Sequence, residues 1–144
     1  MKKLSIYLFI ILIISSIVKL TMVISVKNAY AEPNIATVDD KINLIQESIA
    51  LFEKNDCKSC HKIETKLTGP AYQDVANKYF PQIKDGVITT LSEKVIKGGN
   101  RNWGFAMMTG HPNLSPDDAQ KMVTSVLLLA DPDVPQEKIL KLPN

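Results

Sequence analysis

The chain lacks several features on which common functions depend. Its 17 basic and 15 acidic residues nearly balance, and no basic stripe with interleaved aromatic side chains occurs. Nucleic-acid binding is therefore disfavoured. The sequence has no internal repeat and no low-complexity tract, and it contains only two cysteines and one tryptophan. A disulfide between these two cysteines, three positions apart, would close too small a loop to add much stability.

No segment alternates apolar and polar residues in the manner of a β-strand. Four segments instead repeat apolar residues every three or four positions, which is typical of amphipathic helices. They are residues 39–54, 67–80, 87–100 and 114–130. The sequence therefore predicts an all-α domain of about four short helices joined by loops.

The apolar positions predict the buried face of each helix. These positions are Ile42, Ile45, Ile49 and Phe52; Tyr72, Val75, Ala76 and Tyr79; Ile88, Leu91 and Val95; and Met122, Val126 and Leu129. The last helix has a strong start signal, because Ser115 precedes Pro116 and stands three residues before Asp118. Gly98 and Gly99 predict the end of the third helix.

The N-terminus has the pattern of a secretory signal peptide. Two lysines precede an uncharged apolar run at residues 4–18, and the small residues Ala29 and Ala31 form a cleavage pattern. A retained membrane anchor, extended to Val26, is the competing interpretation. It would bury Lys19 at a cost of roughly 2.5–3.5 kcal/mol. We therefore expect cleavage after Ala31, export to the periplasm, and no membrane span in the mature protein.

The mature chain is long enough for one small domain. It comprises 113 of the 144 residues, and because four of the 17 basic residues precede Glu32, 13 remain against 15 acidic ones. Such small domains bury little surface and usually need a stabilising staple. A large apolar cofactor at the centre would supply it. The expected organisation is a signal peptide at 1–31, a polar lead-in at 32–37, the helical domain at 38–131 and a tail at 132–144.

The two cysteines stand in the string Cys57-Lys58-Ser59-Cys60-His61, which allows three chemistries. A redox dithiol would be expected after a strand in a βαβ pattern, which is lacking. A zinc site would need two such pairs, or His111 as a fourth ligand. The third is covalent haem attachment, for which Cys-x-x-Cys-His is the recognised sequence. On a helical turn the two thiols and His61 lie on one face, so we favour one haem c held by two thioethers, with His61 ligating the iron.

The second axial position of the iron has three candidates, Met107, Met108 and His111. Met122 fits the buried face of its helix, and the two N-terminal methionines leave with the signal peptide. Adjacent residues cannot both point at the iron, so one of Met107 and Met108 is expected to serve packing only. Spacing from the cysteines does not choose between them.

Four landmarks occur in order along residues 38–130: residues 57–61; the string Gly69-Pro70-Ala71-Tyr72; Trp103-Gly104; and a methionine followed by His111-Pro112 and Leu114-Ser115. This stretch, most of the mature chain, resembles a class I bacterial cytochrome c of the small, single-haem kind. The resemblance implies that Met108 is the ligand, because it comes five residues after the tryptophan and three before His-Pro. Met107 departs from the family, which usually has a small residue or proline there.

The resemblance also implies roles for residues around the haem. The carbonyl of Pro70 would accept a hydrogen bond from His61, which orients the ring. Trp103 would donate its indole N–H to a haem propionate. A basic rim would border the haem edge and dock partners; its members are Lys58, Lys62 and Lys66.

The expected function is electron transfer without bound substrate, so the chain is not expected to be an enzyme. Partners would be a donor dehydrogenase or quinol-oxidising complex and an acceptor oxidase or reductase. Two other interpretations remain open. One is a dedicated haem subunit of a periplasmic dehydrogenase of the sulfite or quinoprotein type, with the proline-containing tail as a tether. The other is a haem enzyme or gas sensor in which Met108 leaves the iron.

Overall fold

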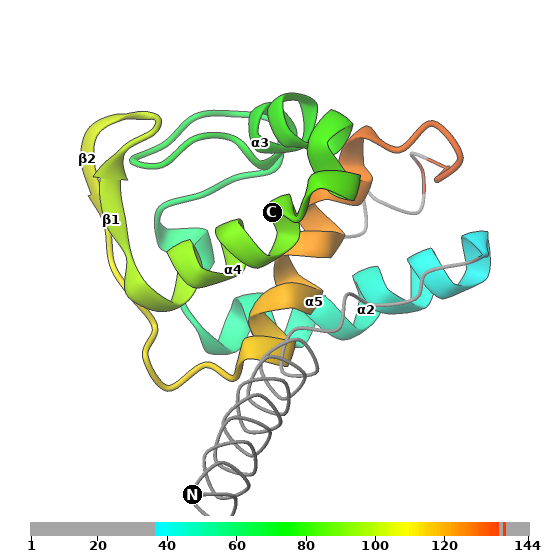
Figure 1. Cartoon of the computed structure of the whole chain (residues 1–144), viewed down its shortest axis with the longest axis horizontal. Helices are drawn as coiled ribbons and strands as arrows, with labels where there is room; N and C mark the ends of the chain where they lie inside the picture. The colour runs from blue at the N-terminus through cyan, green and yellow to red at the C-terminus, as the bar shows by residue number, and fades with distance from the viewer. Residues whose placement is uncertain (1–36, 136, 138–144) are drawn as a thin grey trace, which may run out of the picture. The chain divides into compact units, whose positions relative to one another are not determined.

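A computed structural model describes residues 37–135 and Glu137. The predicted signal peptide, the lead-in up to residue 36 and the end of the tail lie outside these residues. The described helices are α2 (Val38–Lys54), α3 (Tyr72–Tyr79), α4 (Val87–Lys97) and α5 (Pro116–Leu127), and Figure 1 shows their order. Short 3₁₀ turns η1 (Cys57–Ser59), η2 (Phe80–Asp85) and η3 (Leu128–Ala130) connect or extend them. The four predicted helices and the all-α class are confirmed.

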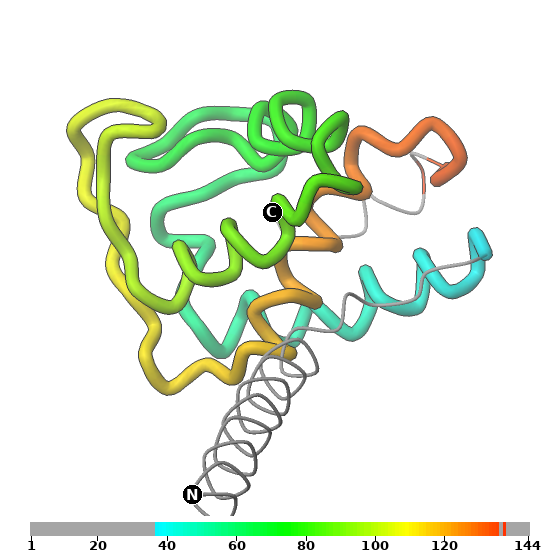
Figure 2. Tube along the Cα trace, in the orientation of Figure 1, coloured from blue at the N-terminus to red at the C-terminus, as the bar shows by residue number. Residues whose placement is uncertain are grey.

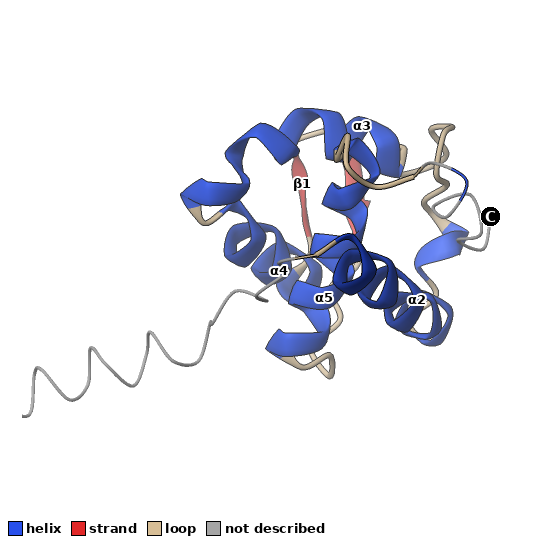
Figure 3. Ribbon diagram, turned by 90° about the vertical axis from the view of Figure 1, so that its right-hand side faces the viewer, coloured by secondary structure: helices blue, strands red, loops and turns tan. Residues whose placement is uncertain are grey.

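α5 is the helix around which the others pack. Figure 3 shows α2 and α4 beside it, and α3 contacts it as well. Ser115 caps its start, since the Asp118 N–H donates to the Ser115 hydroxyl at 3.1 Å. Nearly every residue from Ala119 to Leu129 is buried, and each of the three apolar clusters of the core contains residues of α5 or η3. The fold therefore depends on α5 having apolar residues on several faces.

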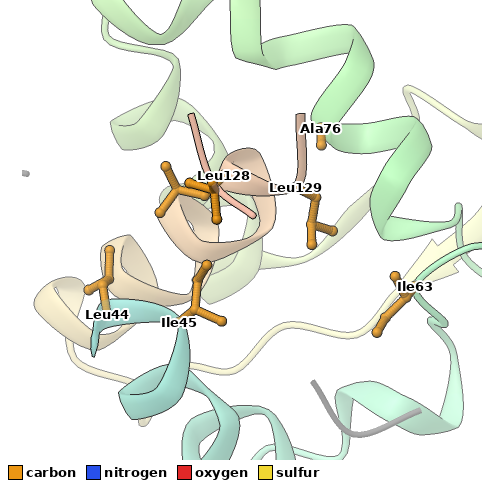
Figure 4. Packing of buried hydrophobic residues seen from close by; sticks show 7 residues of the cluster. Leu44, Ile45, Ile63, Ala76, Leu128 and Leu129 are labelled. Carbon is orange, nitrogen blue, oxygen red and sulfur yellow. The ribbon is translucent and has the colours of Figure 1, made fainter. Parts of the chain in front are cut away.

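α2 packs one face against α5 and η3. A capping box begins it, in which Thr37 and Asp40 bond each other's backbone N–H groups. Leu44 and Ile45 meet Leu128 and Leu129 in the cluster drawn in Figure 4. Ile45 and Phe52 are buried as predicted, whereas Ile42 and Ile49 are only partly buried.

A two-stranded antiparallel hairpin follows α4, where the sequence pattern predicted no strand. Its strands are β1 (Gly99–Arg101) and β2 (Gly104–Met108), with Gly99 paired to Met108 (the yellow segment of Figure 2). Because the strands have three and five residues and none of these is fully buried, no apolar alternation marks them. Backbone pairing alone defines the hairpin, so periodicity could not reveal it.

The first residues of the predicted tail pack onto the domain. Val134 is 2% exposed and belongs to the same cluster as Leu44 and Ile45. Just before the predicted tail, the buried carboxylate of Asp131 pairs with Lys41 of α2 at 2.8 Å. No helix within residues 37–135 is long and apolar enough to cross a membrane.

The Lys41–Asp131 pair is expected to stabilise the domain. Lys41→Met leaves a buried carboxylate with only the Asp133 N–H at 2.9 Å. We expect the free energy of unfolding to fall by about 1–3 kcal/mol. Lys121→Met is the matched control, since its pair with Glu47 at 3.4 Å is exposed and should contribute less than about 1 kcal/mol. Urea denaturation of both variants measures the free energy of unfolding. Equal losses of stability in the two variants would contradict the stabilising role of the Lys41–Asp131 pair.

Candidate functional site

A largely apolar cavity of about 290 Å³ opens between α3, α4, the hairpin and the segment that carries the cysteines. Figure 1 shows these elements around one region of the domain. The inward faces of α3 and α4 line the cavity, through Tyr72, Val75, Leu91 and Val95. The sequence predicts that these side chains are buried, but they are only half-buried. These side chains therefore face a space, and other protein side chains do not fill it.

The cysteines and His61 form one wall of the cavity. After α2 ends, the chain makes a tight turn in which the Cys60 and His61 N–H groups both donate to the Cys57 carbonyl, at 3.2 and 3.0 Å. Asp56 begins this turn in the left-handed region with φ of 55°. Cys57, Cys60 and His61 all line the cavity, and both thiols are free. The turn thus presents the three side chains to one space.

The two competing chemistries of the cysteines gain no support from this geometry. Burial raises the pKa of the Cys57 thiol to about 11, whereas reactive dithiols depend on a lowered thiol pKa. Among the described residues, no group of three or more His, Cys, Asp or Glu side chains is arranged to hold a metal ion. Zinc would require such a group.

The His61 imidazole is oriented by a hydrogen bond. Its Nδ1 lies 2.8 Å from the Pro70 carbonyl oxygen, the contact that the resemblance implies. A carbonyl only accepts, so Nδ1 donates its N–H in this contact, and in the neutral ring Nε2 has the lone pair. Nε2 is then the nitrogen available to ligate a metal.

Gly69 makes room for this imidazole, a role that sequence reasoning missed. A Cβ built on Gly69 would lie 2.7 Å from Nε2 and 2.8 Å from Nδ1 of His61, closer than real Cβ contacts allow. The φ of Gly69 is not in the left-handed region, so backbone strain does not explain the glycine. The Gly-Pro pair is thus more than a turn, and no pattern in one sequence signals this contact.

Tyr72 also contacts the imidazole, which was not predicted, although the sequence places Tyr72 on a helical face and in the string Gly69-Pro70-Ala71-Tyr72. Its ring stacks on His61 with centroids 5.1 Å apart and planes 10° apart. On its other side it meets Phe52 at 5.4 Å. Burial and the neighbouring Cys57 raise the pKa of the Tyr72 hydroxyl far above its ordinary value, so it stays neutral. His61 is therefore held by Pro70, Gly69 and Tyr72 together.

Met108 is the last residue of β2. Three candidate ligands line the cavity: Met107, Met108 and His111. Met107 is 65% exposed, whereas Met108 and His111 are half-buried. Successive residues of a strand point to opposite faces, so the two methionines are directed differently. Burial thus favours Met108 as the side chain that faces inward.

Trp103 and the lysines of the proposed basic rim were expected at the edge of the cofactor. Trp103 lines the cavity, with the Lys78 ammonium 4.7 Å from its ring centroid and Tyr79 packed edge-on at 6.3 Å. Of the proposed basic rim, Lys58 pairs with Glu53 at 3.1 Å. Lys62 and Lys66 are exposed. Lys58 thus has its charge partly compensated.

The residues present fit a haem. Two free thiols stand on one wall beside an imidazole with an available Nε2, a thioether is available in β2, and the remaining lining is mostly apolar. Thioether attachment needs the two thiols, and axial ligation needs nitrogen or sulfur donors.

Known proteins are similar to this chain in sequence. The Cytochrome c family matches residues 45–127. A cytochrome c-552 from Nitrosomonas europaea is 38% identical over 84 residues, which are 58% of this chain and 80% of the relative. A cytochrome c-551 from Pseudomonas aeruginosa is 40% identical over 78 residues, 54% of this chain and 71% of the relative.

A solved structure adds the fold. The crystal structure of wild-type Nitrosomonas europaea cytochrome c552 matches with a TM-score of 0.51 and 39% identity, over 56% of this chain and 96% of that one. The matched family region includes the cysteines, His61 and the hairpin. The chain belongs to the cytochrome c family, and its cofactor is a covalently attached haem c.

Proposed function

We propose that this chain is a periplasmic electron-transfer protein. Cys57 and Cys60 attach its haem, and His61 and Met108 ligate the iron. The observation that carries this proposal is the cavity, bordered by both His61 and Met108, in which the His61 Nδ1 bond to Pro70 leaves Nε2 free. The predicted signal peptide supports the periplasmic location.

Bound haem supplies an iron that cycles between the ferric and ferrous states. The protein's part is to hold two axial donors in place and to exclude water. Pro70, Gly69 and Tyr72 fix the His61 ring, and the apolar faces of α3 and α4 keep the surroundings dry. Trp103 would donate its indole N–H to a propionate. With His61 and Met108 both holding the iron, a substrate would have no open site on it.

The partner-docking face is proposed to include the hairpin. Phe105 is 96% exposed, and the next residues along β2, Ala106 and Met107, line the cavity. An exposed phenyl group beside the cofactor's cavity offers an apolar contact for a brief encounter. Electron-transfer complexes are small and weak, so one such side chain contributes a large share of the contact.

Absorption spectra of the haem-loaded protein test the ligands. Ferric iron bound by methionine sulfur gives a weak red band, which we expect in the wild-type chain and not in Met108→Ala. Met107→Ala is the matched control and should keep the band, since its side chain is mostly exposed. The reduction potential should also fall in Met108→Ala, because methionine ligation raises it.

Other spectra would overturn the assignment in distinct ways. A band that survives in Met108→Ala and disappears in Met107→Ala makes Met107 the ligand. A low-spin wild-type spectrum without the band points to His111. A high-spin spectrum means an open iron and contradicts the electron-carrier function.

The docking contact is tested by electron self-exchange between oxidised and reduced copies of the chain, measured by NMR line broadening. Phe105→Ser should slow self-exchange about fivefold, the effect of losing about 1 kcal/mol of contact, with the reduction potential unchanged. Val38→Ser is the control. Val38 is also exposed, and it begins α2, on the opposite side of the view in Figure 1 from the hairpin. Equal rates in all three proteins would exclude Phe105 from the contact.

A further inference from the structure

The segment that follows Met108 crosses the C-terminal end of α4 with no side chain between the two backbones. A Cβ built on Gly110 would lie 2.8 Å from the carbonyl carbon and oxygen of Lys97, and 2.9 Å from the Ile96 oxygen. A Cβ on Gly98 would lie 2.6 Å from both the Gly110 nitrogen and the Met108 oxygen. Real Cβ atoms do not approach backbone atoms this closely, so both positions require glycine.

Hydrogen bonds fix the crossing in register. The His111 N–H donates to the Val95 carbonyl at 3.1 Å. The last carbonyls of a helix have no partner within it, so this bond satisfies one of them. On the other side of Met108, the hairpin pairs Met108 with Gly99. Met108 is therefore held by its own strand pairing and by the contacts that follow it.

Gly98 and Gly110 require glycine for different reasons. Gly98 ends α4 with φ of 74°, a conformation that other residues rarely adopt, and it is crowded as well. Gly110 is not in the left-handed region, so only the lack of space forbids a side chain there. An added methyl group at residue 110 thus probes the crossing without direct backbone strain.

We propose that Gly98 and Gly110 are positioning residues for the sixth ligand: their backbone contact sets how far the Met108 sulfur reaches into the haem cavity. This inference rests on the proposed function, in which Met108 ligates the iron. Close-packed backbones cannot absorb an extra methyl group, so residues 108–111 must move away from α4 when one is added. The sulfur moves with them, and its bond to the iron weakens.

Imidazole binding to the ferric, haem-loaded protein measures this bond, because imidazole enters only where the methionine leaves. Gly110→Ala should bind imidazole roughly tenfold or more tightly than the wild-type chain and show a weaker red band. Gly86→Ala is the matched control. Gly86 lies at the other end of α4, has φ of 76° and would meet nothing within 4 Å, so alanine there strains the fold without touching Met108. Its imidazole affinity should stay within about twofold of wild type.

A second measurement uses the wild-type chain and needs no variant to fold. Coupling between two sites is reciprocal, so displacing Met108 with imidazole should loosen the crossing. We expect hydrogen exchange of the His111 N–H to speed up about tenfold or more. The Gly69 N–H, which donates to Cys60 at 2.8 Å on the His61 side, is the internal control and should not change.

The outcomes separate the two proposals. If Met108→Ala keeps the red band, the proposed ligand is wrong and the positioning role falls with it. If Met108→Ala loses the band but Gly110→Ala binds imidazole like Gly86→Ala, the ligand stands and the positioning role is wrong. Unchanged exchange of the His111 N–H in imidazole also contradicts the positioning role.

Discussion

The cavity between α3, α4 and the hairpin is the constraint on which the other features depend. α5 buries residues against α2, α3 and α4, yet Val75, Leu91 and Val95 remain only half-buried because their inward sides face the cavity. A domain of this size buries little apolar surface on folding, so its stability is marginal. A haem bound there would complete the core as well as supply the iron, so we expect folding to be coupled to cofactor attachment.

The two sides of the cavity are built differently. His61 is fixed by Pro70, Gly69 and Tyr72, all within eleven residues of it along the chain, and by the turn that begins at Cys57. Such local contacts cost little loop-closure entropy. The imidazole is thus oriented by its own segment, so the ring would not need to reorient when a bound iron changed its oxidation state.

Much of the domain could be predicted from the sequence because its signals are local. Apolar periodicity and the Ser115 cap gave the four helices, and the order of two cysteines and His61 gave the cofactor. What the pattern missed depends on contacts that the periodicity of apolar residues does not encode. The hairpin forms through backbone pairing. Gly69 is required because the ring of His61 lies against it, and Val134 is buried because it packs in a core cluster with residues of α2.

Met108, in contrast, is positioned from outside its own segment. Met108 pairs with Gly99 in the hairpin. The residues that follow pack against the end of α4, through the close backbone approach of Gly98 and Gly110 and the hydrogen bond to the Val95 carbonyl. A change in the packing of α4 would therefore reach Met108, the proposed sixth ligand, whereas the contacts that hold the His61 ring do not involve α4. Because ligation by methionine sulfur would raise the reduction potential, we expect the junction of α4 and the hairpin to be where sequence change tunes the potential without disturbing haem attachment.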